Sequence, residues 1–541
     1  MSDKIYDVIQ LGRGPVGMTS AALIAQAGHS VALVEKHTGL YGHPRAGHID
    51  HEIARVLASV DSAAPVLADA EAPMDYVWKN AQGEVLIDFP WGAQGVSGYN
   101  ADYMMFMPLI DQALADQLKR DPNVADYCGW QAVDFVQHDD HVELVMRRAI
   151  NGEGTNAPVM TDEETRLRGR YLIASDGANS PVRRQLDIAQ VDLGFNERWL
   201  IVDALRKREL RKFDPDCGQI CDPRRPVTIL PLGKRHRRWE WYMFENETTE
   251  EFLKPAKAWE LLAEQGVTPD DVEIIRQLPY VFSARLARRW HNGRIFLMGD
   301  AAHTMPPFMG QGMCSGIRDA TNLSWKLDLV LRGVCTPEIF DTYQKERLPH
   351  VRDWTLISIE SGKLPCTVDP TAADERDRKF REGWKPPMPN FPKLVDGIFH
   401  RKADGKLSAP TGDLAVQGRV RVDGKVDLLD SFLPRGKFLV LSTGVDGAAV
   451  LNAEQLARLD KLGTVFAIVM PAQEHEGSEP VDVDGRYAAY FAEHGIEVLI
   501  MRPDFYVFGA GRMTDLPAIV QDLLDQLRVD SVSTAAPAVE T

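Results

Sequence analysis

The stretch Arg294-Ile-Phe-Leu-Met-Gly-Asp-Ala-Ala-His303, continued by Thr304-Met-Pro-Pro-Phe-Met-Gly-Gln-Gly-Met313, decides the fold. The apolar run 295–298 predicts a buried strand, and Gly299-Asp300 places a carboxylate at its C-terminal end, where ligands of α/β sheets bind. Residues 315–331 predict a helix. The intervening loop is rich in proline and glycine, so it is rigid and its backbone can approach a flat ligand closely. Such a loop before a helix directs amide groups at electron-rich ligand atoms.

A second ligand-binding pattern opens the chain. The run 5–11 predicts a strand, Gly12-Arg-Gly-Pro-Val-Gly17 a tight turn, and 18–27 a helix of small residues. The next strand is predicted at 31–34, with Glu35 at its end. This is the G-x-G-x-x-G dinucleotide-binding fingerprint in its required context, with a strand before it and a helix after it.

Each residue of this fingerprint has a physical role. Gly12 permits the turn, Gly14 lets a pyrophosphate approach the backbone at the helix N-terminus, and Gly17 lets helix and strand pack closely. Glu35 can accept hydrogen bonds from ribose hydroxyls. The pattern therefore predicts a nucleotide-binding α/β domain at the start of the chain.

Other segments extend this domain and predict a second one. The loop 41–48 carries Arg45 and leads into an amphipathic helix. The run 168–176 predicts another strand, which ends in Asp176-Gly177 and again places a carboxylate and a glycine at a strand end. Strand patterns dominate 193–290, which predicts an antiparallel sheet able to cover a pocket.

The composition limits the kinds of partner. With 541 residues, 44% hydrophobic and 26% charged, the chain is long enough for two or three domains. Its formal net charge of −17 argues against nucleic acid or an anionic membrane as the main partner. No apolar run approaches the roughly 18 residues of a membrane span, and the N-terminus lacks a signal-peptide pattern, so we expect a cytoplasmic protein. The six cysteines lack zinc-site spacing, and we expect reduced thiols and no metal site.

Taken together, the motifs resemble those of the group A FAD-dependent aromatic hydroxylases, which share the para-hydroxybenzoate hydroxylase fold. Their order is the same: the Gly12 to Gly17 fingerprint, then Asp176-Gly177, then Gly299-Asp300 with its continuation to Lys326. Within this group the chain resembles the 3-(3-hydroxyphenyl)propionate hydroxylase-like monooxygenases, most clearly over residues 4–360. This closer resemblance is carried by Glu197-Arg-Trp-Leu200, Cys221-Asp-Pro223, Arg225-Pro226, Arg238-Trp-Glu240, Asp319-Ala320 and Asn322-Leu323.

The resemblance implies an α/β fold with a Rossmann-like FAD-binding domain, an inserted antiparallel-sheet substrate domain and a C-terminal thioredoxin-like domain. We expect the FAD-binding domain at 1–190 and 281–380, with part of the substrate domain at about 75–105. The remaining boundaries are expected as 191–280 for the substrate-binding sheet, 381–432 for a linker, 433–528 for the thioredoxin-like domain and 529–541 for a disordered tail. No Cys-x-x-Cys motif occurs in the last domain, so we expect it to serve packing or dimer formation rather than redox chemistry.

The resemblance also implies which residues contact the cofactors, FAD and a transiently bound NADPH or NADH. Arg45 would lie near the flavin, and Asp300 near the ribityl and pyrophosphate region. The Asp176-Gly177 motif is implicated in binding both cofactors. The expected cofactor-binding residues are Gly12, Gly14, Pro15, Val16, Gly17, Glu35, Lys36, Arg45, Asp176, Gly177, Gly299, Asp300, Pro307, Gly310, Gln311, Gly312 and Met313.

The implied reaction is hydroxylation of a phenolic, 3-(3-hydroxyphenyl)propionate-like ring, in which NAD(P)H reduces FAD and O2 is captured as a C4a-hydroperoxide. The partners would be a small aromatic substrate, O2 and a second copy of the chain in a homodimer. His48 is the candidate general base, because its loop places it beside Arg45, and the alternative is a histidine satisfied by backbone hydrogen bonds or by packing.

The substrate contacts and the substrate itself stay open. Trp239 and Trp241 could pack on an aromatic ring, although alternating aromatics on a strand more often belong to a core. Arg238 or Arg225 could hold a substrate carboxylate, and the sequence does not decide between them. The ring could also be another substituted, halogenated or nitrated phenol, a heteroaromatic or a polyketide. A flavin-dependent dehydrogenase or oxidase and a non-catalytic flavin-binding regulator remain as other classes.

Overall fold

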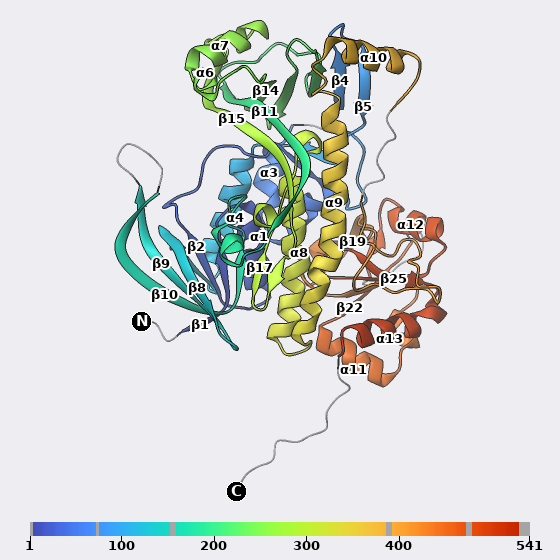
Figure 1. Cartoon of the computed structure of the whole chain (residues 1–541). Helices are drawn as coiled ribbons and strands as arrows, with labels where there is room; N and C mark the ends of the chain where they lie inside the picture. Colours follow the sequence, from blue (N-terminus) through green and yellow to red (C-terminus); the bar gives the residue numbers. More distant parts are fainter. Residues whose placement is uncertain (1–3, 72–74, 152–157, 386–391, 472–478, 530–541) are drawn as a thin grey trace. The chain divides into compact units, whose positions relative to one another are not determined.

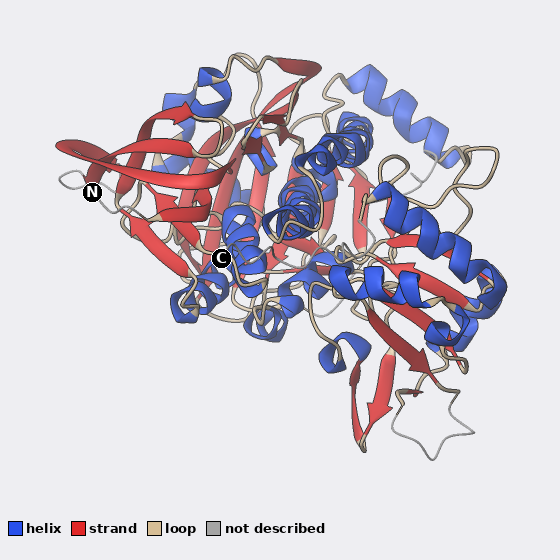
Figure 2. Cartoon of the chain, turned by 90° about the horizontal axis from the view of Figure 1, so that it is seen from below, coloured by secondary structure: helices blue, strands red, loops and turns tan. Residues whose placement is uncertain are grey.

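The structure, a computed structural model, describes residues 4–71, 75–151, 158–385, 392–471 and 479–529 and divides into two compact units (Figure 1). The first unit comprises residues 1–95, 99–320 and 351–392, and the second comprises 96–98, 321–350 and 393–541. Both units combine helices and strands, drawn in blue and red in Figure 2, and both have a core of their own. The α/β class predicted from the sequence is confirmed.

The first sheet of unit 1 is built around parallel strands. Its eight strands follow the order β16-β17-β10-β1-β2-β7, with β9 paired to β10 and β8 paired to β9. The strands from β17 to β7 are parallel, so their carboxyl ends meet at one edge of the sheet and bring the three sequence motifs together. The strands are β1 (Ile5–Leu11), β2 (Val31–Glu35), β7 (Val124–Cys128), β8 (Trp130–Gln137), β9 (Val142–Asn151), β10 (Pro158–Ala174), β16 (His291–Asn292) and β17 (Ile295–Leu297).

Helix α1 shows why the first helix packs tightly on this sheet. Its residues are small or apolar, and Met18, Ala21 and Ile24 are almost fully buried. Pro15 stands in the first turn, where its missing N–H group leaves no hydrogen bond unmade. The α-helices that contribute to unit 1 are α1 (Pro15–Gln26), α2 (His51–Ser59), α3 (Ala63–Asp69), α4 (Met107–Arg120), α5 (Pro181–Gln185), α6 (Thr249–Phe252), α7 (Pro255–Glu264), α8 (Gln311–Leu331), α9 (Asp341–Lys363) and α10 (Pro370–Arg381).

The second sheet of unit 1 is largely antiparallel. Its order is β18-β15-β11-β14-β13-β12-β4-β5, and the pair β12 and β4 is parallel. One face carries a core cluster in which Trp239 and Trp241 pack with Phe252 of α6 and Leu261 of α7. The strands are β4 (Tyr76–Asn80), β5 (Val85–Phe89), β11 (Gln190–Arg206), β12 (Gly218–Cys221), β13 (Val227–Leu232), β14 (His236–Tyr242), β15 (Val272–Ala287) and β18 (His303–Thr304). The antiparallel substrate sheet predicted from the sequence is thus confirmed.

Unit 2 contains a four-stranded sheet with the order β22-β21-β24-β25 and a three-stranded sheet β20-β19-β23. β21 and β22 are parallel, while β24 is antiparallel to both of its neighbours. This order matches the thioredoxin-like arrangement expected for the C-terminal domain. The elements are β19 (Arg419–Val422), β20 (Lys425–Leu428), β21 (Leu439–Thr443), α11 (Ala453–Leu462), β22 (Val465–Val469), β23 (Val481–Asp482), α12 (Arg486–His494), β24 (Val498–Met501), β25 (Val507–Gly511) and α13 (Leu516–Gln526).

The two compact units divide the chain at positions that differ from the expected domain boundaries. Residues 393–432, expected as part of a linker, belong to unit 2, because Val416 and Val420 are buried in its core. Residues 321–350, expected within the FAD-binding domain, are also part of unit 2. Val529, expected to begin the disordered tail, is almost fully buried and accepts a hydrogen bond from Arg458, while 530–541 lie outside the described residues.

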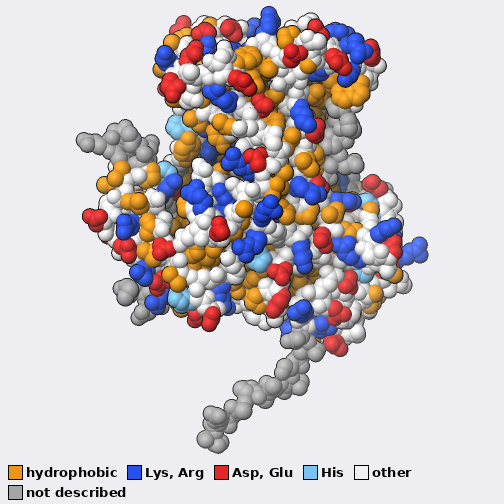
Figure 3. Space-filling model, in the orientation of Figure 1, with side chains coloured by type: hydrophobic (Ala, Val, Ile, Leu, Met, Phe, Trp, Pro, Cys, Tyr) orange, Lys and Arg blue, Asp and Glu red, His pale blue; other side chains and the backbone are white. Residues whose placement is uncertain are grey.

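None of the helices that the structure describes combines the length and the apolar character needed to cross a membrane. On the face shown in Figure 3, basic and acidic side chains are interspersed among apolar ones. This mixed pattern is usual for a hydrated protein surface.

Candidate active site

Two connected cavities lie in unit 1 beside the carboxyl edge of the parallel sheet. The nucleotide cavity, of about 320 Å³, is lined by Gly12, Gly14, Glu35, Lys36, Arg45, Trp130, Asp176 and Gly177, among others. The aromatic cavity, of about 310 Å³, is lined by residues that include Tyr76, Trp91, Tyr280, Phe282 and Phe308. Gly14, Arg45, Ser175 and Gly177 line both, so the two cavities are parts of one site.

The glycine turn after β1 leaves no room for side chains. A Cβ atom on Gly12 would lie 2.4 Å from the carbonyl oxygen of Ser175, and Gly12 has a positive φ of 101°. A Cβ atom on Gly17 would lie 2.1 Å from the carbonyl oxygen of Gly12. The turn therefore holds β1, β10 and α1 in close contact, as the fingerprint predicts.

The N-terminus of α1 is open toward a ligand. Its N-cap residue is Gly14, without a side-chain cap, and its first turn has no acidic residue. Amide groups at such a terminus favour an anion. Beside them, the Glu35 carboxylate accepts hydrogen bonds from the backbone N–H groups of Arg13 and His37, both at 3.0 Å, which fixes its position at the end of β2.

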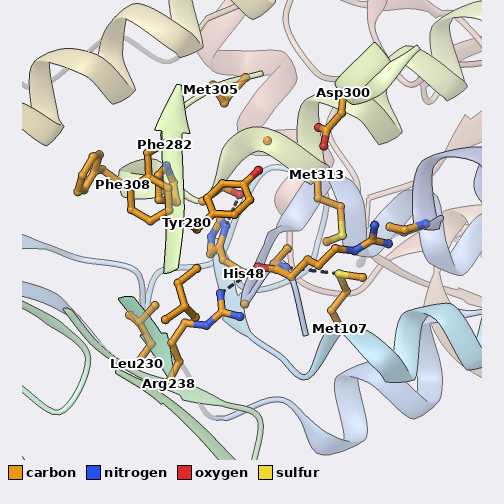
Figure 4. Close-up of a pocket in the computed structure, with 18 of the residues that line it drawn as sticks. His48, Met107, Leu230, Arg238, Tyr280, Phe282, Asp300, Met305, Phe308 and Met313 are labelled. Carbon is orange, nitrogen blue, oxygen red and sulfur yellow. Dashed lines mark hydrogen bonds between the residues drawn. The ribbon is translucent and has the colours of Figure 1, made fainter. Parts of the chain in front are cut away.

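Asp300 follows β17, at the same carboxyl edge of the parallel sheet. Its side chain is accessible through the aromatic cavity, and the surrounding protein desolvates it and raises its pKa, while His303 and Arg45 act in the opposite direction. In Figure 4, Asp300 lies toward one end of the pocket and Leu230 and Arg238 toward the other. An uncommitted acceptor at this position suits a ligand with hydroxyl donors.

The loop before α8 lines the cavity with its backbone. Pro307, Gly310, Gly312 and Met313 are all lining residues. Gly310 has a φ of 66°, and a Cβ atom there would lie 2.5 Å from Nδ1 of His48. The position therefore requires glycine both for its conformation and for its contact with His48.

Two expected cofactor residues have other contacts. The Gln311 side chain turns to a buried cluster, where it donates to Asp50 at 3.1 Å and accepts from Arg318 at 2.7 Å. Gly299 packs against α1, since a Cβ atom there would lie 3.3 Å from Val16. The expected contact of the 307–313 loop with the flavin is through main-chain groups, and these side-chain contacts leave that expectation untested. Of the other expected cofactor residues, Pro15, Val16 and Gly17 line the aromatic cavity with Asp300.

His48 lies in the wall of the aromatic cavity at the start of β3 (His48–Asp50), which pairs with β6 (Asp102–Met104). Its Nε2 donates to Asp102 at 2.7 Å and its Nδ1 donates to the carbonyl oxygen of Gly310 at 3.3 Å. Because both partners are acceptors, the ring carries two protons in this arrangement. Burial acts to lower the pKa of His48, but the interactions with Asp102 and Cys314 together outweigh burial and raise this pKa well above its ordinary value.

The alternation of β14 sorts its side chains onto two faces. Arg238 and Glu240 line the aromatic cavity, whereas Trp239 and Trp241 lie in the core cluster on the opposite face, at 0% and 1% exposure. The expectation that these two tryptophans contact the substrate is therefore wrong. The aromatic wall of the cavity comes instead from Tyr76, Trp91, Tyr280, Phe282 and Phe308.

Arg238 donates four hydrogen bonds to protein acceptors. Its guanidinium donates to both carboxylate oxygens of Asp203, at 2.7 and 3.1 Å, and to the carbonyl oxygens of Pro44 and Arg45, at 3.0 and 2.9 Å. Arg225, the other candidate for binding a substrate carboxylate, pairs with Glu247. Arg238 therefore fastens the loop before β3 to the second sheet. Its expected role in holding a substrate carboxylate stays a prediction.

A polar row crosses the cavity wall, and the sequence reasoning missed it. Glu240 lies opposite Thr228 on β13, which lies opposite Gln219 on β12. The Thr228 hydroxyl donates to Gln219 at 2.8 Å, and Gln219 donates to the Tyr76 hydroxyl at 2.8 Å. All four line the aromatic cavity and are at most 5% exposed. The sequence signal for this row was the alternation of Arg238 and Glu240 with Trp239 and Trp241, which puts the charged residues on one face of β14.

Comparison with protein families accounts for nearly the whole chain. Residues 6–357 match the FAD binding domain family, and residues 412–526 match the HcaD C-terminal domain family. A probable NADH-specific resorcinol 4-hydroxylase from Rhodococcus jostii (strain RHA1) is 34% identical over 526 residues, covering 96% of this chain and 95% of the relative. A 3-(3-hydroxy-phenyl)propionate/3-hydroxycinnamic acid hydroxylase from Shigella sonnei (strain Ss046) is 32% identical, with coverage of 95% and 93%.

Solved structures share the fold at lower identity. The flavin-dependent monooxygenase PieE, in complex with FAD and substrate, superposes with a TM-score of 0.79 at 18% identity over 98% of this chain and 100% of its own. Aklavinone-11 hydroxylase, in complex with FAD and aklavinone, gives 0.74 at 21% identity over 97% and 100%. The architecture described above is therefore one that other chains of similar length adopt.

Proposed function

The chain belongs to the FAD binding domain family and is a flavin-dependent aromatic hydroxylase, and from this premise we propose that its substrate is a small neutral phenol of the resorcinol type. We propose NADH as the reductant, because the relative with 34% identity is described as NADH-specific. The observation that carries the substrate proposal is that Arg238 donates four hydrogen bonds to Asp203 and two carbonyl groups.

The two connected cavities suit FAD. The uncapped N-terminus of α1 and the backbone of Gly12 and Gly14 would hold the pyrophosphate, and Glu35 would bind the ribose. Asp300 and the loop 307–313 would contact the flavin side of the cofactor. When bound, FAD supplies electron transfer from the nicotinamide and the activation of O2 for insertion of one oxygen atom into the ring. The protein binds and orients the substrate and the cofactor, and it excludes water from the site.

The charges of the aromatic cavity support a neutral substrate. Among the described residues that line it, the cations with long side chains are Arg45, Arg238 and Arg276. Arg238 and Arg276 both pair with Asp203, and Arg45 also lines the nucleotide cavity, where an anionic cofactor would compete for it. Glu240 adds a buried carboxyl group. A substrate carboxylate placed beside Glu240 would be desolvated without a free counter-ion, which is costly.

We propose that His48 is a positioning residue rather than the general base. Its doubly hydrogen-bonded ring joins Asp102 to the carbonyl oxygen of Gly310. Through Gly310 it would hold the loop 307–313 in the conformation that contacts the cofactor. A base needs a lone pair directed at the substrate, and both nitrogen atoms of His48 already donate to protein acceptors.

A substrate panel tests the proposal. The purified holoenzyme would be given NADH, O2 and either resorcinol or 3-(3-hydroxyphenyl)propionate, with NADH consumption and product mass measured together. We expect resorcinol to have the higher kcat/KM and to gain one oxygen atom. A higher kcat/KM for the propionate would overturn the neutral-phenol proposal. NADH oxidation that yields only hydrogen peroxide with every phenol would favour an oxidase.

A further inference from the structure

We propose that Glu240 accepts the proton of the substrate's phenolic hydroxyl, and this inference rests on the proposed function. Glu240 lies in the middle of β14, between Ile201 on β11 and Thr228 on β13. It lines the aromatic cavity together with both neighbours. The aromatic cavity has two carboxyl groups in its wall, Glu240 and Asp300, and Asp300 is the one assigned above to the cofactor. A phenol held beside Ile201 and Thr228 would therefore meet the carboxyl group of Glu240.

The carboxyl group of Glu240 is not committed to a close ion pair. Its Oε1 lies 3.7 Å from Nη1 of Arg238, beyond hydrogen-bond distance, while Arg238 contacts Asp203 at 2.7 Å. The carboxyl group therefore keeps acceptor capacity for a ligand. This distinguishes Glu240 from His48, whose two nitrogen atoms both have protein acceptors.

The polar row gives Glu240 a partner in both protonation states. Gln219 donates to Tyr76 through Nε2, so its Oε1 accepts the Thr228 hydroxyl. When Glu240 is protonated, it can donate to the Thr228 oxygen and leave that bond intact. When Glu240 is ionised, rotation of the Thr228 hydroxyl turns the same proton toward the carboxylate. One hydroxyl rotation thus accommodates gain and loss of the proton.

The surroundings also tune Glu240 as a base. Burial raises its pKa, and Asp203 on β11 adds to the shift, while Arg238 on β14, Arg276 on β15 and the hydrogen bond with Thr228 oppose it. A raised pKa brings the carboxylate closer in basicity to a phenolate, which favours proton transfer. In the transfer the phenol O–H bond breaks and a carboxyl O–H bond forms, leaving a phenolate and no change in oxidation state. The proton returns to water after product release.

Glu240→Gln tests the assignment, because it preserves size and most hydrogen bonds but cannot accept a proton. We expect unchanged FAD content and a coupled hydroxylation rate lowered by about 10²- to 10⁴-fold at neutral pH. The matched control is Glu197→Gln on β11, another partly buried glutamate with a raised pKa, which should keep the wild-type rate.

Two readouts separate proton transfer from a structural role. A polyfluorinated phenol whose pKa lies below the assay pH is largely ionised in solution and should restore most of the lost rate in Glu240→Gln. Thr228→Val removes the hydroxyl donor to the carboxylate, so it should move the acid limb of the kcat/KM profile to higher pH. An unrescued loss in Glu240→Gln, or a wild-type rate and pH profile, would overturn the assignment.

The test does not depend on the neutral-phenol proposal. It uses whichever phenol the wild-type enzyme hydroxylates, including 3-(3-hydroxyphenyl)propionate. A wrong substrate class would change the phenol in the assay, whereas a wrong base would leave Glu240→Gln active on the true substrate.

Discussion

Nε of Arg238 donates to Oδ1 of Asp203 over 2.7 Å, and the carboxylate that it meets is completely buried. The same carboxylate accepts from Arg276 at 3.3 Å. Asp203 is therefore the shared counter-ion of both arginines on the sheet side of the aromatic cavity. We therefore expect the substrate selectivity of this site to depend on a residue that does not line the cavity.

Asp203→Asn should destabilise the protein and relax its selectivity. Loss of the carboxylate leaves Arg238 and Arg276 buried without a counter-ion, which should lower the free energy of unfolding by about 3 to 5 kcal/mol. If the variant folds, a freed arginine should raise kcat/KM for carboxylate-bearing phenols relative to neutral ones. Chemical denaturation and the substrate panel measure the two effects. Asp222→Asn, whose partner Arg224 is 83% exposed, should leave the denaturation midpoint nearly unchanged.

Asp102→Asn should change how stability depends on pH. Asp102 raises the pKa of His48 in the folded state, so the pair stabilises the fold fully below the unfolded pKa of about 6.5 and loses this contribution as pH rises through the raised value. We expect the variant to lose about 1 to 3 kcal/mol at pH 5.5 and progressively less in alkaline buffer. Denaturation across pH measures the difference. A loss that is constant with pH would contradict a protonated His48.

Gly310→Ala should lower the FAD content of the protein more than an alanine at another glycine of positive φ does. The new Cβ atom would lie 2.5 Å from His48, and a φ of 66° is itself unfavourable for alanine by about 1 to 2 kcal/mol. Gly194→Ala is the control, because Gly194 has a φ of 77° with open space around it. Flavin absorbance per protein should fall only in Gly310→Ala. Equal flavin content in the two variants would argue against a role of the loop in holding FAD.

Asp300→Ala should weaken FAD binding. The loss of one charged hydrogen-bond acceptor is worth about 1.5 to 3 kcal/mol, which corresponds to a roughly 10- to 150-fold higher Kd. Fluorescence titration of the apoprotein with FAD measures this change. Asp192→Ala, which removes an exposed aspartate of the second sheet, should keep the wild-type Kd. An unaltered Kd for Asp300→Ala would remove Asp300 from the cofactor site.

The nucleotide half of the site was predictable because its signals are local. Gly12, Gly14 and Glu35 occupy a short segment whose strand, turn and helix dictate one another. The carboxylates Asp176 and Asp300 were placed correctly because parallel strands bring their carboxyl ends to one edge. These inferences need only strand direction, which the sequence pattern provides.

The substrate half was harder, because it depends on pairings between distant strands. The face of β14 that meets the cavity could not be read from Arg238-Trp-Glu-Trp241, since both faces are buried and both therefore carry side chains of low exposure. The pairing of Arg238 with Asp203 joins residues 35 positions apart. Without that partner, Arg238 looked available for a substrate, and no role could be given to Glu240.

The parallel pairing of β1, β10 and β17 also limits when FAD can bind during translation. Ile5 pairs with Arg168 and Leu172 with Ile295, so the edge that would receive FAD is assembled from strands made far apart in time. A nascent chain whose residue Asp300 has not yet left the ribosome has only the strand ends that carry Gly12 and Asp176. FAD capture is then a late event in biosynthesis, and chains truncated before residue 298 would emerge colourless however well their first strands had folded.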